Sequence, residues 1–196
     1  MKTNNKKGMT TRTLVLGAVL TALVVILQFM APLFRFTLFS LSFVLVPIVL
    51  GAALCGTKVS TWLGFVFGVV VLISGDAASF LAVDIPGTII TVLVKGTACG
   101  LAAGVVYQLL EKHRYLAVFT AAAVCPIVNT GVFLIGCRVF FWETLKAWGA
   151  SLGYDNVIAY AFIGLAGVSF LIELGINLVL SPVIIRLLNI RKKQTA

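Results

Sequence analysis

Residues 86–110 form a long apolar stretch that carries a lysine, Lys95, near its middle. About 20 apolar residues span a bilayer when they are helical, so this stretch is long enough to cross one. An ammonium group in hydrocarbon costs at least ~2.5–3.5 kcal/mol, so Lys95 should face protein, water or a ligand. Thr88 and Thr91 precede Lys95 at helical spacing, which predicts one polar face along this helix.

A second stripe of the same stretch consists of Gly96, Gly100 and Gly104. Glycines four residues apart remove the side chains from one face of a helix and let another helix approach closely. The stretch therefore predicts a helix with a polar face and a separate packing face.

The composition indicates a membrane protein. Of the 196 residues, 61% are hydrophobic and 11% are charged, and the mean hydropathy is +1.13. Soluble domains are nearer ~45–50% apolar and ~25% charged. The net charge of +9 lies mostly at the ends of apolar segments, which indicates contact with a membrane surface rather than with nucleic acid. The four cysteines fall in or beside apolar segments, where they are typical of small packing residues.

Apolar segments predict an all-α integral membrane protein, with six transmembrane helices in one bundle and a single domain over residues 1–196. The predicted helices cover about 12–31, 38–55, 59–74, 86–110, 115–141 and 157–188. Longer loops are expected on the outer side, at 74–85 and 142–156.

The distribution of lysine and arginine predicts the orientation. With both termini in the cytoplasm, eleven of the 15 basic residues lie inside, two (Arg35 and Lys146) lie outside, and Lys95 and Arg138 lie within or near the membrane. Because basic residues concentrate on the cytoplasmic side, the sequence favours cytoplasmic N- and C-termini.

Polar residues inside the predicted helices are candidates for a binding site. Asn129 lies in the middle of the fifth segment, and the sixth carries a polar stripe of Ser169, Glu173, Asn177 and Ser181 at intervals of four. An intramembrane carboxylate needs a partner or a proton. Glu173 could therefore form a structural ion pair with Lys95, or both residues could contact a ligand.

Other candidates lie toward the outer side. Asp76 and Asp84 flank an apolar segment that contains Phe80, and these residues could order a lid over a site or simply be solvated. Arg138 is nine residues after Asn129, which places it about 180° around an ideal helix, so both residues face one cavity only if the helix kinks or ends early. Arg138 could therefore either bind the ligand or extend to the lipid headgroups.

Signals of catalysis are missing from the sequence. The segment 51–58 has glycines and a lysine, but it lacks the order of a phosphate-binding loop. His113 is the only histidine, and no group of residues has the spacing of a zinc site. We expect no cofactor, no metal and no enzymatic activity.

Three stretches together resemble the substrate-binding S components of energy-coupling factor (ECF) transporters, a bacterial family of vitamin carriers. They are LGAVLTAL at 16–23, FVLVPIVLGAALCG at 43–56 and KGTACGLAAG at 95–104. With the six predicted helices, the resemblance covers nearly the whole chain, and it is strongest to the subgroup that holds riboflavin, pantothenate and folate carriers.

The resemblance implies capture of a small vitamin-like molecule at the outer face of the bacterial plasma membrane. A transmembrane coupling subunit and two ATPase subunits would then drive uptake. Ala18 and Ala22 on the first helix would dock onto the coupling subunit. The substrate would contact residues in the outer halves of the last three helices and in the outer loops, here Asp76, Phe80, Asp84, Thr91, Lys95, Asn129, Arg138, Glu173 and Asn177.

Two other functions remain open from the residues. A self-sufficient secondary carrier is one, although the two halves of the chain show no convincing inverted repeat. An intramembrane enzyme is the other, although its acids are scattered. No motif selects one substrate among riboflavin, pantothenate, folate and related molecules.

Overall fold

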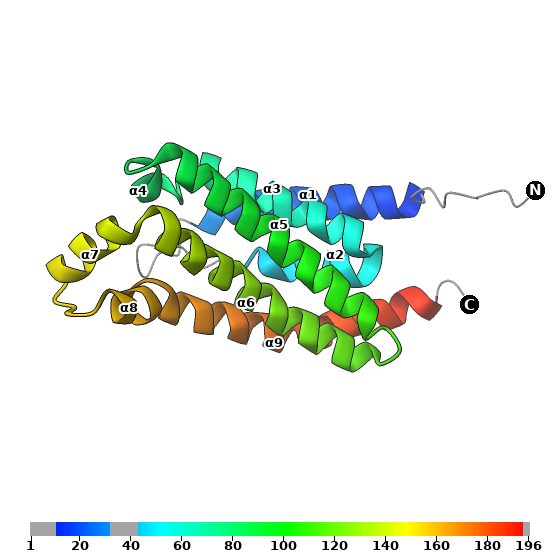
Figure 1. Cartoon of the computed structure of the whole chain (residues 1–196). Coiled ribbons are helices and arrows are strands. Elements are labelled where there is room, and N and C mark those ends of the chain that lie inside the picture. Colours follow the sequence, from blue (N-terminus) through cyan, green and yellow to red (C-terminus); the bar gives the residue numbers. More distant parts are fainter. Residues whose placement is uncertain (1–10, 32–42, 194–196) are drawn as a thin grey trace, which may run out of the picture.

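The computed structural model describes residues 11–31 and 43–193, and the regular structure in these residues is helical (Figure 1). The prediction of an all-α protein is therefore confirmed for the described part of the chain. The elements are α1 (Thr11–Met30), α2 (Leu45–Cys55), α3 (Thr57–Ile73), α4 (Ala78–Leu81), α5 (Ile85–Leu109), α6 (Arg114–Phe140), α7 (Trp142–Ser151), α8 (Val157–Ala159), the π-helix η2 (Tyr160–Gly167) and α9 (Val168–Lys193).

Four helical stretches of the described residues are long and apolar enough to cross a membrane. They are Thr11–Met30, Ile85–Leu109, Arg114–Phe140 and Val157–Ile190, while α2 and α3 are shorter apolar helices. Helix α2 begins at Leu45, later than the predicted start of the second helix at residue 38. Residue 38 itself and Arg35, which was predicted on the outer side, lie outside the described residues. The other predicted boundaries agree with the observed helices to within a few residues, except that the last helix continues to Lys193.

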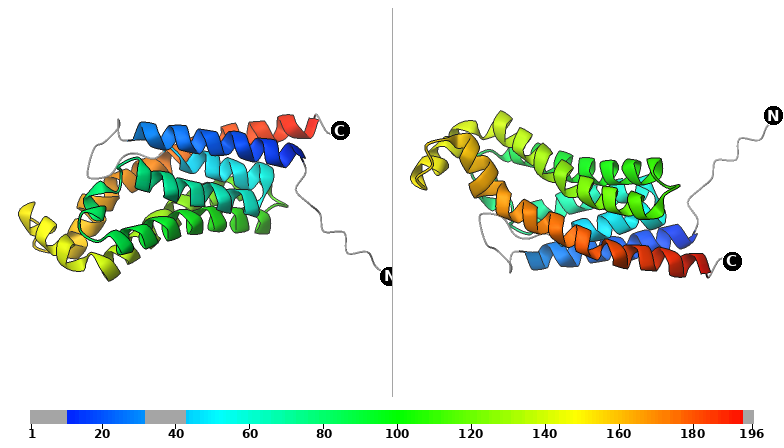
Figure 2. Two further views of the ribbon diagram at one scale, coloured as in Figure 1. Left: turned by 90° about the horizontal axis from the view of Figure 1, so that it is seen from above. Right: turned by 90° about the horizontal axis from the view of Figure 1, so that it is seen from below.

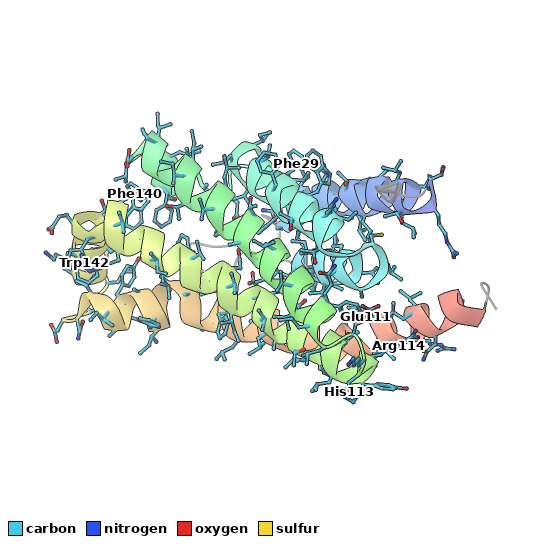
Figure 3. All side chains as sticks on the ribbon, turned by 45° about the vertical axis from the view of Figure 1, so that its right-hand side comes forward. Phe29, Glu111, His113, Arg114, Phe140 and Trp142 are labelled. Carbon is cyan, nitrogen blue, oxygen red and sulfur yellow. The ribbon has the colours of Figure 1, made fainter. Side chains whose placement is uncertain are left out.

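The helices form an elongated bundle (Figure 1). Helix α1 begins and α9 finishes at one end of the bundle, whereas α4, α7 and α8 lie at the opposite end (Figure 2). The tight turn between α2 and α3 has Gly56 at φ 87°, a backbone conformation that glycine adopts without steric cost. Figure 3 shows His113 and Arg114 at the start of α6, far from Phe140 at its other end and from Trp142, which follows that end.

Helices α3 and α5 pack with their backbones in contact. A Cβ atom on Gly96 would overlap the carbonyl oxygen of Gly64, and one on Gly100 would overlap the carbonyl oxygen of Ser60. The Ser60 hydroxyl also donates a hydrogen bond of 2.8 Å to the Gly100 carbonyl oxygen. The glycine stripe predicted close approach of a neighbouring helix, and this prediction is confirmed.

The two connections that the sequence predicts as outer loops contain helices. Helix α4 lies within 74–85 and α7 within 142–156, so the prediction of plain loops is wrong there. The physical reason is an aromatic cluster that holds both segments against the bundle. The Phe80 ring lies 5.6 Å from Phe133, 5.0 Å from Phe141 and 5.4 Å from Trp148, in edge-to-face arrangements.

Substitution of Gly100 should test the contact between α3 and α5. In Gly100→Ala, the new methyl group would overlap the Ser60 backbone. We therefore expect the free energy of unfolding to fall by ~1–3 kcal/mol, as at other overpacked sites. Gly175→Ala is the matched control, because a Cβ at Gly175 meets nothing within 4 Å. The free energy of unfolding of Gly175→Ala should rise by ~0.4–1 kcal/mol, because alanine lowers the backbone entropy of the unfolded chain. Thermal melting in detergent measures both, and equal melting of the two variants would contradict the packing argument.

Candidate functional site

A polar cavity lies among α5, α6, the junction of η2 with α9, and the turn after α3. Its volume is about 50 Å³, enough for a few water molecules, since one needs ~10–15 Å³. It is lined by Asp76, Lys95, Asn129, Thr130, Phe133, Leu165, Ala166, Ser169, Phe170 and Glu173. We call the space that these ten residues enclose the polar cavity. Four of the predicted site residues, from four different elements or turns, therefore meet here.

Lys95 is the cation of the polar cavity, and it is only 8% exposed. Its ammonium nitrogen lies 5.2 Å from the centroid of the Phe133 ring and 5.7 Å from that of Phe67. Such contacts contribute roughly 0.5–2 kcal/mol each. Within the described part of the chain, Lys95 makes no hydrogen bond and no ion pair, so it does not form the ion pair with Glu173 that the sequence left open.

Two carboxylates share the polar cavity with this cation. Asp76 is 9% exposed and Glu173 is 6% exposed. Asp76 accepts a hydrogen bond of 3.3 Å from the side-chain nitrogen of Gln28, a fully buried residue of α1. This bond ties the last turn of α1 to the turn that follows α3.

Some buried polar atoms near the polar cavity have no hydrogen-bond partner among the residues that the structure describes. They include Oγ1 of Thr91 and the side-chain oxygens of Asn129 and Asn177. A buried polar group that lacks a partner costs ~1–3 kcal/mol. Because Asn129 lines the polar cavity, a ligand or water that donates a hydrogen bond there would recover this free energy.

A smaller cavity of about 10 Å³ adjoins the polar cavity and shares Asp76, Lys95 and Phe133 with it. Phe80 and Thr91 line this second cavity. Six of the predicted substrate-contacting residues thus surround two adjoining cavities, with Lys95 between them.

The other three predicted residues do not line these two cavities. Asp84 is the N-cap of α5, where its carboxylate accepts a 3.2 Å hydrogen bond from the backbone nitrogen of Gly87. Asn177 is buried one turn beyond Glu173 and donates a 2.9 Å hydrogen bond to its backbone oxygen. Arg138 lies in the last turn of α6, with its guanidinium carbon 4.2 Å from the centroid of the Trp142 ring.

Several lining residues were not predicted as site residues, although helical spacing would have found most of them. Phe133 follows Asn129 by one turn, and Ala166 precedes Glu173 by two turns. Residues spaced in this way share one face of a helix. Gln28 gave a weaker signal, since it is the one amide in the apolar part of α1.

The side chains that line the two cavities are of kinds that bind a polar ligand. An ammonium group, two carboxylates, an amide and aromatic rings can bind a ligand with both donor and acceptor groups. Among the described residues, no group of three or more histidines, cysteines, aspartates or glutamates is placed to hold a metal ion.

Comparison with known proteins gives one finding. Residues 12–185 match the model of the family described as ECF transporter, substrate-specific component. No curated protein and no solved structure matches the chain.

Variants of Gln28 should test its hydrogen bond with Asp76. We expect Gln28→Leu to lose ~1 kcal/mol of unfolding free energy, the typical net value of a hydrogen bond. Gln28→Glu should lose ~3–5 kcal/mol, because it places a second buried carboxylate beside Asp76. Gln108, which is exposed on α5, provides the control, and Gln108→Glu should stay within ~0.5 kcal/mol. If Gln28→Glu melts no lower than Gln28→Leu in detergent, the bond does not form in solution.

Proposed function

The chain belongs to the substrate-specific components of ECF transporters, and we propose that it captures a vitamin or a related small molecule at the outer face of the bacterial plasma membrane. Members of this family bind substrate for uptake and are not enzymes. We propose further that a transmembrane coupling subunit and two ATPase subunits supply the energy, and that residues 1–196 act as one transmembrane domain.

The observation that best supports this proposal is the burial of Lys95 beside Asp76, Asn129 and Glu173. A buried charge usually carries a desolvation penalty of several kcal/mol unless it is paired. The described residues give the Lys95 ammonium only two aromatic rings. A ligand with an anionic or strongly polar acceptor group would supply the missing partner, so we assign Lys95 to ligand contact rather than to a structural ion pair.

We propose six membrane spans with both termini in the cytoplasm. The arrangement of the bundle supports this orientation, because α1 begins and α9 finishes at the same end. Arg12, Lys58, Lys112 and Arg114 lie in the turns or helix starts of that end, as expected for a cytoplasmic side. The polar cavity then lies nearer the outer side, where a substrate would arrive.

The first helix provides the proposed docking surface for the coupling subunit. Ala18 and Ala22 are exposed on α1, together with Leu14, Val15 and Val19, which are 53%, 58% and 60% exposed. Small residues four apart on an apolar face permit close approach of another helix. The rest of the bundle buries only 17% of the membrane-spanning window of α1, which leaves most of its surface for a partner.

The ligand that we propose is a polar, vitamin-sized molecule of the kind carried by the riboflavin, pantothenate and folate subgroup. A cavity of about 50 Å³ holds only the polar end of such a molecule. Binding of the whole molecule therefore requires the cavity to widen toward the outer side. Phe133 and Phe170 line the cavity and could stack on a flat ring.

Uptake measurements should separate binding from transport. Cells that express this chain alone should bind the substrate without accumulating it, and addition of the coupling and ATPase subunits should give accumulation. With those subunits, Ala18→Trp should abolish uptake and leave substrate affinity unchanged, because an indole holds a partner helix several Å away. Val94→Trp is the control, since Val94 is 50% exposed on α5 and should not affect uptake. Accumulation by the chain alone would refute the proposal.

The role of Lys95 can be decided with three variants. We expect Lys95→Met to lower substrate affinity about ten- to a hundredfold, which corresponds to a charge-assisted hydrogen bond of ~1.5–3 kcal/mol. The empty protein should keep its melting temperature, because no carboxylate in the described residues pairs with Lys95.

An ion pair between Lys95 and Glu173 would give a different result. Lys95→Met would then lose ~3–5 kcal/mol of stability, and the double variant Lys95→Met, Glu173→Gln would recover most of it. The measurements are thermal melting in detergent and titration with riboflavin, pantothenate and folate. Recovery of melting by the double variant, with affinity unchanged throughout, would rule out ligand contact.

A further inference from the structure

An apolar groove lies on the opposite side of α6 from the polar cavity, between the outer part of α6, helix α7 and the segment 158–162. Its volume is about 390 Å³, several times that of the polar cavity. The groove is lined by Gly131, Leu134, Ile135, Cys137, Arg138, Trp142, Leu145, Ile158, Ala161 and Phe162. We call the space between these residues the outer groove. Nine of the ten lining residues are apolar or are glycine, and Arg138 is the one charged residue.

Arg138 stands at the edge of the outer groove beside Trp142, which lies just beyond the end of α6 (Figure 3). Arg138 is exposed, and its guanidinium carbon lies 4.2 Å from the centroid of the Trp142 ring. No acidic side chain of the described residues pairs with it. In contrast, Lys146 of α7 pairs with Glu143 at 2.7 Å. Arg138 is therefore a cation that is available to an anion from outside the chain.

The outer groove faces lipid rather than the interior of the bundle. Ile135, Ile158 and Phe162 of its lining are 65%, 55% and 59% exposed, and they belong to membrane-spanning helical stretches. Tryptophan and arginine at the end of such a helix are typical of the headgroup level of a bilayer. A matching ligand therefore has an apolar chain in the groove and an anionic group at its end.

A second groove continues the first toward the middle of the membrane. It has a volume of about 190 Å³ and shares Gly131, Leu134 and Phe162 with the outer groove. Apart from Thr130, its lining is apolar. The two grooves together form a track along α6 that suits an acyl chain, with Arg138 at the headgroup end.

We propose that the outer groove binds an anionic phospholipid, with one acyl chain along α6 and the phosphate on Arg138. The guanidinium can donate two parallel hydrogen bonds to phosphate oxygens, and the Trp142 ring holds it in position. The site is separate from the polar cavity and does not depend on the identity of the transported substrate.

Quenching of Trp142 fluorescence by brominated lipids tests this proposal directly. All variants would carry Trp62→Phe and Trp148→Phe, which leave Trp142 as the only tryptophan, and the full chain would be placed in phosphatidylcholine vesicles. Brominated phosphatidylglycerol should reach the same quenching of Trp142 at about a fivefold lower mole fraction than brominated phosphatidylcholine. The reason is that one basic residue at a membrane surface contributes ~1 kcal/mol to the binding of anionic lipid.

Two substitutions then test the headgroup contact. Arg138→Gln should remove the preference for phosphatidylglycerol. Lys146→Gln removes a charge of the same sign from neighbouring α7, where Glu143 already neutralises it, and it should keep the preference. Equal quenching by both lipids in the parent protein, or equal loss in both variants, would show only ordinary lipid contact or a general charge effect and would overturn the proposal.

Gly131→Leu tests the acyl-chain track. A Cβ at Gly131 meets nothing within 4 Å, so leucine can enter both grooves without a clash, and thermal melting in detergent should not fall. We expect quenching by brominated phosphatidylglycerol to require about a fivefold higher mole fraction. If Gly131→Leu leaves the quenching curve unchanged, no acyl chain occupies the groove and the proposal is wrong.

Discussion

The ammonium group of Lys95 must be kept out of lipid, and the packing of the surrounding helices meets this requirement. Phe67 of α3 and Phe133 of α6 present their rings to it, and α9 brings Glu173 to the same polar cavity. The close α3–α5 contact at Gly96 holds the helix of Phe67 against that of Lys95. Aromatic rings offset only part of the desolvation of a buried cation, so the arrangement favours a polar ligand.

Local helical spacing explains what the sequence could predict. The face of Lys95 and the stripe of Gly96, Gly100 and Gly104 follow from residues within one segment, as does the buried position of Glu173. The same rule separates Arg138 from Asn129, which lie on opposite sides of α6 and line different cavities. Asp84 also carried a readable signal, because an aspartate just before Ile-Pro-Gly is typical of a helix N-cap.

Features that depend on distant contacts could not be predicted in this way. Gln28 and Asp76 are 48 positions apart, and nothing in the sequence around either residue indicates the other. Helix α7 is only ten residues long, and tertiary packing of Leu145 and Trp148 into the aromatic cluster around Phe80 stabilises it more than its own propensity can. The π-helical segment η2 has no sequence signature, yet its Leu165 and Ala166 line the polar cavity.

The hydrogen bond between Gln28 and Asp76 has a thermodynamic consequence. It joins α1, whose outward face is largely uncovered by the bundle, to a residue that lines the polar cavity. Linkage between two binding sites is reciprocal. If a ligand in the cavity changes the affinity of α1 for a partner, the partner changes the affinity of the cavity for the ligand by the same factor. A protein that binds α1 and is coupled to the cavity in this way also changes the affinity of the cavity for its ligand.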